Sequence, residues 1–238
     1  MQSGLKQLIC SLALISPLVL TSCARSQTEN HQPGLSSVDM IRISQVPSLN
    51  WVSVADIAKE LKGKPPMAVG FDVDDTVLFS SPGFYHGQQV FSPGGYSYLK
   101  NQKFWNDLNC HWDAFSMPKE IAKKLIAMHQ KRGDDIYFIT ARTYSKCEIT
   151  TQYLKKIFHI KHMNPVIFTG SKKGVLTKVP YIKAHDIKIY YGDSDSDILA
   201  ARKAGAEGIR IIRAANSSYK PVPKNGDLGE QVVRDSQY

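Results

Sequence analysis

The sequence is poor in cysteine and lacks long apolar runs and clustered histidines, and each shortage excludes a class of protein. Four cysteines among 238 residues are too few for a disulfide-stabilised framework. The apolar run at residues 8–20 is too short to span a bilayer comfortably, and the seven histidines show no metal-ligand spacing. The formal charge of +9 is not gathered into a basic stripe with interleaved aromatics, so it suits small anionic ligands better than nucleic acid.

The first residues have the features of a targeting segment. Residues 20–23, Leu-Thr-Ser-Cys, resemble the lipobox of bacterial lipoproteins with Cys23 as the acylated residue, while an ordinary signal peptidase could instead cut before Arg25. We therefore expect a signal peptide over residues 1–24 and a flexible polar tether over residues 25–36. Either cleavage predicts export to the periplasm, and the first adds a lipid anchor to a membrane.

Two cysteines, Cys110 and Cys147, remain for the folded part of the chain. One pair could form a bridge in an oxidising compartment, but a single pair is weak evidence for one. Neither cysteine has a histidine or acid beside it in metal-ligand spacing. The sequence therefore favours two unpaired thiols.

Residues 37–238 show alternating strand and helix patterns, which predict one α/β domain. This alternation implies a Rossmann-like parallel sheet with helices on both faces. Residues 79–116 break the pattern with glycines, prolines and many aromatics, so we expect a small cap insertion there. The tail from residue 214 is rich in Asn, Ser, Pro and Gly and is expected to wrap the surface or a neighbouring subunit. Expected strands are 67–71, 135–140, 165–169, 187–191 and 208–213, and expected helices are 53–62, 116–132 (with Ser116 as N-cap), 146–157, 178–185 and 195–204.

The strand at 67–71 leads directly into two acids, Asp72 and Asp74, followed by Thr76. Side chains alternate along a strand, so these two carboxylates should point the same way from its carboxyl end. Two anions held together are costly unless a cation or a shared proton relieves the repulsion. A divalent metal would do so, and a carboxylate beside a metal can attack phosphorus.

Further polar residues follow the other predicted strands. Asp193 and Asp197 come after 187–191, with Gly192 allowing a close turn of the backbone. Thr140 ends the strand 135–140 and Arg142 comes just after it, while Lys178 follows 165–169 after a turn rich in Gly and Lys. Ligands bind open α/β sheets outside the carboxyl ends of the strands, so all these residues should meet at one site.

These motifs resemble those of the haloacid dehalogenase superfamily of phosphatases. From about Leu35 to Tyr238 the chain is similar to the bacterial class B acid phosphatases, which are nonspecific and secreted. The residues that carry this closer resemblance are Phe-Asp-Val-Asp-Asp-Thr-Val-Leu-Phe-Ser-Ser-Pro (71–82), Phe104–Trp105, Tyr-Gly-Asp-Ser-Asp-Ser-Asp-Ile (191–198) and Ser-Tyr-Lys-Pro (218–221).

The resemblance, together with the spacing, assigns roles to the acids. Asp72 would be the nucleophile that forms an aspartyl-phosphate, and Asp74 the general acid and then the base. One Mg²⁺ per subunit would be held by Asp72, the backbone carbonyl of Asp74, and Asp193, with Asp197 supporting the site from behind. Asp75 is expected to be a structural residue of the turn.

Thr140 and Lys178 would hold the phosphoryl group, with Lys172, Lys173 and Lys183 as alternatives to Lys178. Arg142 has a planar fork suited to phosphate, or it forms a salt bridge at a helix start. Five residues match positions that form an apolar slot for the leaving group in the family, although ordinary packing within the cap would also explain them: Phe84, Tyr98, Leu99, Trp105 and Tyr219.

The resemblance implies an exported, Mg²⁺-dependent acid phosphatase that hydrolyses phosphate monoesters, including nucleoside monophosphates. It also implies phosphotransfer to alcohols and a homotetramer, with small organic phosphates and nucleotides as partners and no specific nucleic acid. Two alternatives use the same fold type. A phosphorylatable receiver module also has a strand-end Asp, a Thr and a Lys, but export and Asp74 argue against it. An exported non-catalytic phosphate- or nucleotide-binding protein would retain the fold without turnover.

Overall fold

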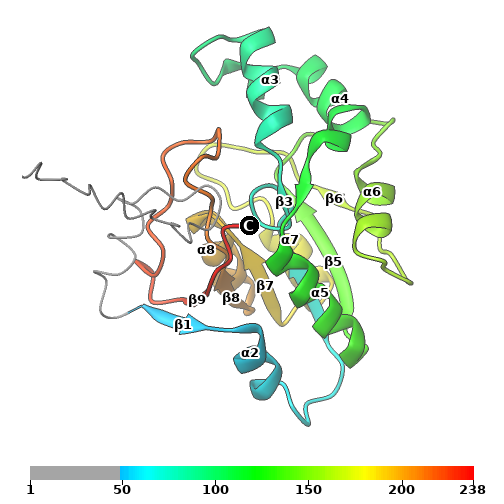
Figure 1. Ribbon diagram of the computed structural model, residues 1–238, viewed down its shortest axis with the longest axis vertical. Helices are drawn as coiled ribbons and strands as arrows, with labels where there is room; N and C mark the ends of the chain where they lie inside the picture. Colours follow the sequence, from blue (N-terminus) through cyan, green and yellow to red (C-terminus); the bar gives the residue numbers. More distant parts are fainter. Residues whose placement is uncertain (1–48) are drawn as a thin grey trace, which may run out of the picture. The chain divides into compact units, whose positions relative to one another are not determined.

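Seven parallel strands form the central sheet of the computed structural model, which describes residues 49–238 (Figure 1). The strand order is β1-β9-β8-β7-β2-β5-β6. This parallel α/β sheet confirms the predicted fold class. The predicted signal peptide, the tether and Cys23 lie outside the described residues. The strands of this sheet are β1 Asn50–Val52, β2 Ala68–Phe71, β5 Asp135–Thr140, β6 Ile167–Phe168, β7 Ile189–Gly192, β8 Glu207–Arg210 and β9 Gln231–Val233.

The central strands are covered by helices on both faces because their apolar side chains alternate between two cores. Phe71 and Phe138 point into one core with α2 (Val54–Glu60), α5 (Glu120–Arg132) and α6 (Thr150–Ile157). Ile139 and Tyr190 point into the other, with α7 (Val179–Ala184) and α8 (Asp195–Ala204). Strands buried on both faces are apolar at every position, as the sequence of β2 and β7 shows.

The sequence prediction was wrong at several element boundaries. The helix expected from Ser116 begins at Glu120, because Met117–Pro118 (β4) is extended and pairs with Leu78–Phe79 (β3). The helix expected at 146–157 begins at Thr150. The tail beyond residue 214 does not only wrap the surface. Its residues Gln231–Val233 form β9 and lie in parallel register with the unpredicted strand β1.

Two helices and two short 3-10 turns occupy the segment between β3 and β4. They are α3 Ser81–Phe91, η1 Ser97–Lys100, α4 Gln102–Cys110 and η2 Trp112–Phe115. Figure 1 shows α3 and α4 together at one end of the sheet, opposite the end where α2 lies. Their aromatic side chains form a separate cluster around Phe104, which is fully buried. This segment, called the cap below, therefore has a small apolar core of its own.

Cys110 and Cys147 form a disulfide, so the prediction of unpaired thiols was wrong. Cys110 is the last residue of α4, and Cys147 lies in the loop that follows β5. Their Cα atoms are 5.2 Å apart, although the residues are 37 positions apart in the sequence. Only the packing of the cap on this loop brings them together, and no local pattern indicates it.

A buried polar cluster connects α5 to β7, where His129 Nε2 lies 2.9 Å from the Tyr191 hydroxyl. The Asp134 carboxylate accepts hydrogen bonds from His129 Nδ1 (2.7 Å), Arg132 Nε (2.9 Å) and the Met67 amide (3.0 Å). Burial lowers the pKa of His129. Its Nδ1 carries a hydrogen because the Asp134 carboxylate can only accept one. Burial raises the pKa of Asp134, but the hydrogen bonds from His129 and its other donors more than offset this and lower it.

Replacing Asp134 with asparagine is expected to destabilise the fold by about 3 kcal/mol, because an ionised buried partner of Arg132 and His129 is lost. This corresponds to a fall in Tm of roughly 6–12 °C. The pKa of Asp134 is lowered from 3.8, so its stabilisation is present above that pH and is lost as the pH falls through the folded-state pKa. The Tm gap to wild type should therefore narrow below about pH 3.8.

The exposed neighbour Asp135 provides the matched control, since Asp135→Asn removes the same charge and should change stability by less than about 0.5 kcal/mol. Equal melting temperatures for Asp134→Asn and Asp135→Asn at pH 7 would contradict this account.

Among residues 49–238, no helix is both long and apolar enough to cross a membrane.

Candidate active site

The site begins at the carboxyl ends of β2 and β7, which lie side by side in the sheet. Asp72 directly follows β2, and its amide donates to the Tyr191 carbonyl at 2.9 Å. Asp193 directly follows β7, and a turn then leads into α8 and Asp197. Gly192 is required here because a Cβ at this position would lie 2.2 Å from the Asp197 Cβ. The backbone thus turns closely, as the sequence predicted.

Three buried carboxylates, Asp72, Asp193 and Asp197, lie within 4.8 Å of one another by their ligand atoms. Lys178 lies between two of them, with its Nζ 2.5 Å from Asp72 Oδ1 and 2.7 Å from Asp197 Oδ1. Burial raises the pKa of Asp72 well above its ordinary value against the opposing effect of Lys178, and the charges of Asp197 and Asp193 add to this rise. Burial lowers the pKa of Lys178, but Asp197 and Asp72 reverse this and raise it well above its usual range.

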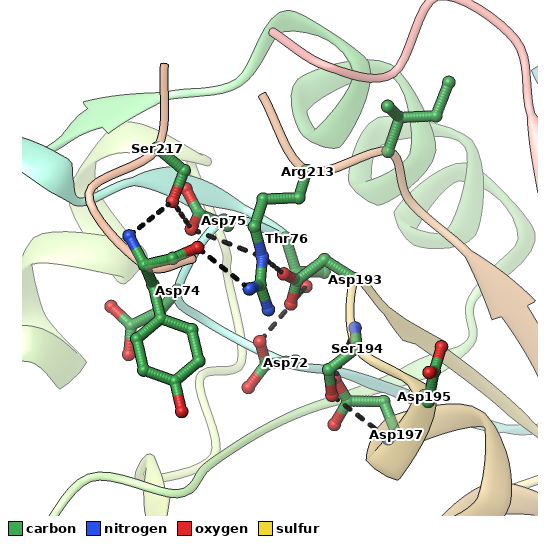
Figure 2. Close-up of polar contacts among 12 residues, drawn as sticks. Asp72, Asp74, Asp75, Thr76, Asp193, Ser194, Asp195, Asp197, Arg213 and Ser217 are labelled. Atoms are coloured by element: carbon green, nitrogen blue, oxygen red, sulfur yellow. Dashed lines mark hydrogen bonds and ion pairs between the residues drawn. The ribbon is translucent and has the colours of Figure 1, made fainter. Parts of the chain in front are cut away.

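Asp72 and Asp193 face each other across the Thr76 hydroxyl (Figure 2). Thr76 Oγ1 lies 3.1 Å from Asp72 Oδ2 and 3.2 Å from Asp193 Oδ1. A hydroxyl has one hydrogen, so it cannot donate fully to both oxygens. On its other side Asp193 Oδ2 accepts from Arg213 Nε at 2.5 Å.

The arrangement fits a divalent cation between these two carboxylates. Three negative charges from Asp72, Asp193 and Asp197 are opposed only by Lys178 and Arg213 among the described residues that contact them. Both oxygens of Asp197 are already engaged, one by Lys178 and the other by the Ser194 hydroxyl and amide. An all-oxygen donor set of this kind suits Mg²⁺.

Asp74, two residues after Asp72, is held by Arg142 and Ser80. Arg142 donates from Nε to Oδ2 at 2.9 Å and from Nη2 to Oδ1 at 2.7 Å, while the Ser80 hydroxyl donates to Oδ1 at 2.6 Å. Burial raises the pKa of Asp74, but Arg142 and Ser80 more than offset this and lower it. Arg142 thus forms a salt bridge with Asp74 in the turn after β2, not the bridge at a helix start that the sequence offered as an alternative, and its contact with phosphate stays a prediction.

The side chain of Asp75 turns away from those of Asp72 and Asp74, as expected for a structural residue of the turn. It adopts the left-handed conformation with φ 57°, and its Oδ2 accepts from the Ser217 hydroxyl at 2.6 Å. Burial raises its pKa to about 6. Beside it, Lys119 is buried and donates to the carbonyls of Asp75 (2.6 Å) and Ile212 (2.9 Å). These bonds fix the turn that presents Asp72 and Asp74.

A pocket of about 280 Å³ opens over these groups and brings together residues from several distant segments. Thr140 and Lys178 line it, whereas Lys172, Lys173 and Lys183 are exposed and do not. Tyr98 does not line it either, because its ring is buried against Phe104 with centroids 4.8 Å apart. The residues predicted from the sequence that line the pocket are Asp72, Asp74, Phe84, Leu99, Trp105, Thr140, Arg142, Lys178, Asp193, Asp197 and Tyr219.

Sequence reasoning missed several residues of the site. Arg213, which holds Asp193, ends the strand expected at 208–213, so its place at a carboxyl end was the signal that could have found it. Ser80 holds Asp74, and it stands in the motif that follows the first acids. Asp113 and Asn109 contact Arg142 from the cap, and nothing in their sequence surroundings indicates this.

Comparisons with known proteins agree with this arrangement. The sequence matches the family described as HAD superfamily, subfamily IIIB (acid phosphatase), over residues 28–222. A class B acid phosphatase from Marinomonas sp. (strain MWYL1) is 61% identical over 96% of this chain and 97% of that protein. One from Klebsiella pneumoniae (strain 342) is 52% identical over 98% of this chain and 100% of that protein. A haloacid dehalogenase-like hydrolase from Bacteroides fragilis shares the fold, with TM-score 0.50 and 15% identity over 73% of this chain and 99% of that chain.

Proposed function

The chain belongs to subfamily IIIB of the haloacid dehalogenase superfamily, the acid phosphatases, and we propose that it hydrolyses phosphate monoesters with Mg²⁺ through a phosphorylated Asp72. The observation that carries this proposal is the shared pocket over Asp72 and Asp74, with Lys178 and Thr140 on its walls. Phosphoryl transfer requires a nucleophile, charge neutralisation and a proton for the leaving oxygen, and these residues supply each of them.

In the first step an Asp72 oxygen attacks phosphorus, and the bond from phosphorus to the ester oxygen breaks. Burial raises the pKa of Asp74 but Arg142 and Ser80 lower it overall, so acidic pH favours the protonated form. That form gives its proton to the ester oxygen, and the product leaves as an alcohol. In the second step Asp74, now ionised, takes a proton from water, whose oxygen attacks the aspartyl-phosphate. The bond from phosphorus to Asp72 breaks, and inorganic phosphate and the free carboxylate are regenerated.

Lys178 and Thr140 hold the transferred group in this mechanism. The Lys178 ammonium lies against Asp72, so it can neutralise charge on a phosphoryl group bound there. Thr140 lines the same pocket and offers a hydroxyl. Asp72 and Asp193, with the Asp74 carbonyl, would hold Mg²⁺, while Asp197 keeps Lys178 in place. When bound, the ion neutralises negative charge on the phosphoryl oxygens.

Apolar and aromatic side chains line the pocket beyond the carboxylates, which supports substrates with a flat leaving group. Phe84, Leu99 and Trp105 come from the cap, and Tyr219 from the tail. Flat apolar groups gain about 0.5–1.5 kcal/mol per aromatic pair beyond burial. We therefore propose substrates with aryl or nucleoside leaving groups.

Export, lipidation at Cys23, phosphotransfer to alcohols and a homotetramer are further proposals. They rest on the targeting pattern of residues 1–24 and on the family resemblance. The mature N-terminal residue decides between the two cleavage sites, since lipidation leaves Cys23 first and ordinary cleavage leaves Arg25 first.

Phosphate release from 4-nitrophenyl phosphate, with and without EDTA, tests the proposed function. We expect EDTA to remove the activity and excess Mg²⁺ to restore it, while EDTA saturated with Mg²⁺ beforehand has no effect. Activity that survives exhaustive chelation would contradict the metal requirement. Binding of phosphate or a nucleotide without any phosphate release would favour the non-catalytic alternative.

A further inference from the structure

The Arg142 guanidinium lies between two carboxylates, one in the pocket and one in the cap. Its Nε and Nη2 donate to Asp74, and its Nη1 donates to Asp113 Oδ2 at 2.7 Å and to Asn109 Oδ1 at 3.2 Å. Arg142 has five N–H groups, so four are used within the protein. Arg142, Asp113 and Asn109 are all buried, with 0–1% of their surface exposed.

Asp113 is itself held from the loop side. Its Oδ2 also accepts a hydrogen bond from the Thr150 hydroxyl at the start of α6. Both Thr150 and Arg142 donate to one oxygen of Asp113. Asp113 therefore connects the loop that carries Arg142 with α6, the helix that follows this loop. A charged hydrogen bond in a buried site is strong and directional, so it fixes the plane of the guanidinium.

Several other contacts fasten the same two segments. Asn109 Nδ2 donates to the Thr143 carbonyl at 2.8 Å, and the Ile149 amide donates to the Asn109 carbonyl at 2.9 Å. The disulfide between Cys110 and Cys147 adds a covalent link at the end of α4. The cap is therefore joined to the loop of residues 141–149, which carries Arg142.

We propose that Asp113 is a positioning residue that, through Arg142, holds the Asp74 carboxyl group in place for proton transfer. This inference rests on the proposed acid–base role of Asp74. Asp113 does not line the pocket among the described residues, so it acts only through the guanidinium. Without the charge of Asp113, Arg142 would lose its strongest partner in the cap. The Asp74 carboxyl group, which Arg142 binds on the pocket side, would then lose its fixed orientation.

The leaving group provides the test, because a good leaving group needs little help from the acid and a poor one needs much. The expected effect of Asp113→Asn is a fall in kcat/KM of roughly 100-fold for glycerol phosphate and less than about fivefold for 4-nitrophenyl phosphate. KM for both substrates should change little. Asp74→Asn sets the reference and should show the same pattern with larger losses.

Asp107 on α4 provides the matched control, since it is paired only with exposed Lys103 in the described structure. Asp107→Asn removes the same charge and should stay within twofold of wild type for both substrates. If Asp113→Asn fails to fold, Thr150→Val removes one donor to Asp113 at nearly constant volume and should show the same pattern, reduced to roughly tenfold for glycerol phosphate.

Suppose that Asp74→Asn shows the expected pattern. Asp113→Asn would then overturn this inference if it lost activity equally for the two substrates or lost none. If Asp74→Asn itself lacks that pattern, the acid–base role in the proposed function fails instead.

Discussion

Asp72→Asn is expected to lower phosphate-ester hydrolysis by about 10⁴-fold or more while leaving the protein folded. An amide has nearly the shape of the carboxylate but cannot attack phosphorus. Burial and the charges of Asp197 and Asp193 raise the pKa of Asp72, so the ionised group lies in an unfavourable place. Its neutral replacement should therefore keep or increase the Tm measured in EDTA.

The control for this change is Asp195→Asn, which removes a carboxylate at the start of α8, the helix that carries Asp197, and outside the pocket lining. Asp195 pairs with Arg210, and its side chain is 57% exposed, so we expect activity within a few-fold of wild type. A folded Asp72→Asn protein that still turns over phosphate esters at more than trace rates would rule out Asp72 as the nucleophile.

The core of this site could be predicted because its residues follow strands whose pattern is local. Asp72, Thr140, Lys178 and Asp193 each end or follow a run that the sequence identifies as a strand, and parallel strands place their carboxyl ends at one edge. The sheet's outer strands were not predictable in this way. β1 and β9 have three residues each and pair with each other, although they lie far apart in the sequence. No local signal marks either of them.

The cap shows how packing overrides local propensity. Pro82, Gly83 and Gly87 lie within α3, where glycine would ordinarily weaken a helix. A Cβ at Gly87 would lie 2.3 Å from the Phe104 ring, and one at Gly83 would lie 2.7 Å from Leu108. The glycines that made the segment look irregular are thus the residues that let α3 approach α4.

The role of Arg142 depends on contacts between segments that lie apart in the sequence. Its fork suits a phosphate or a carboxylate equally well, and only the fold shows that Asp74 and Asp113 occupy it. The disulfide of Cys110 depends on the same juxtaposition. Residue type alone therefore predicts the chemistry that a side chain can perform, while its partners come from tertiary structure.

Lys178→Met is expected to lower kcat by about 10²–10³-fold, because the only cation that contacts both Asp72 and Asp197 among the described residues is removed. The loss of a buried partner should also cost about 3–5 kcal/mol of stability in EDTA. Three buried carboxylates would then face one another, opposed among the described residues by Arg213 alone. Added Mg²⁺ should therefore raise the Tm of Lys178→Met by more than it raises that of wild type.

Lys183→Met provides the matched control, because Lys183 lies on the same helix, α7, and is exposed. It should keep wild-type activity and Tm within error, since exposed lysines contribute little to either. Thermal melts in EDTA and in excess Mg²⁺, together with kcat for 4-nitrophenyl phosphate, measure both effects. If Lys178→Met kept wild-type kcat, or if Mg²⁺ stabilised it no more than wild type, the charge balance described for the three carboxylates would be wrong.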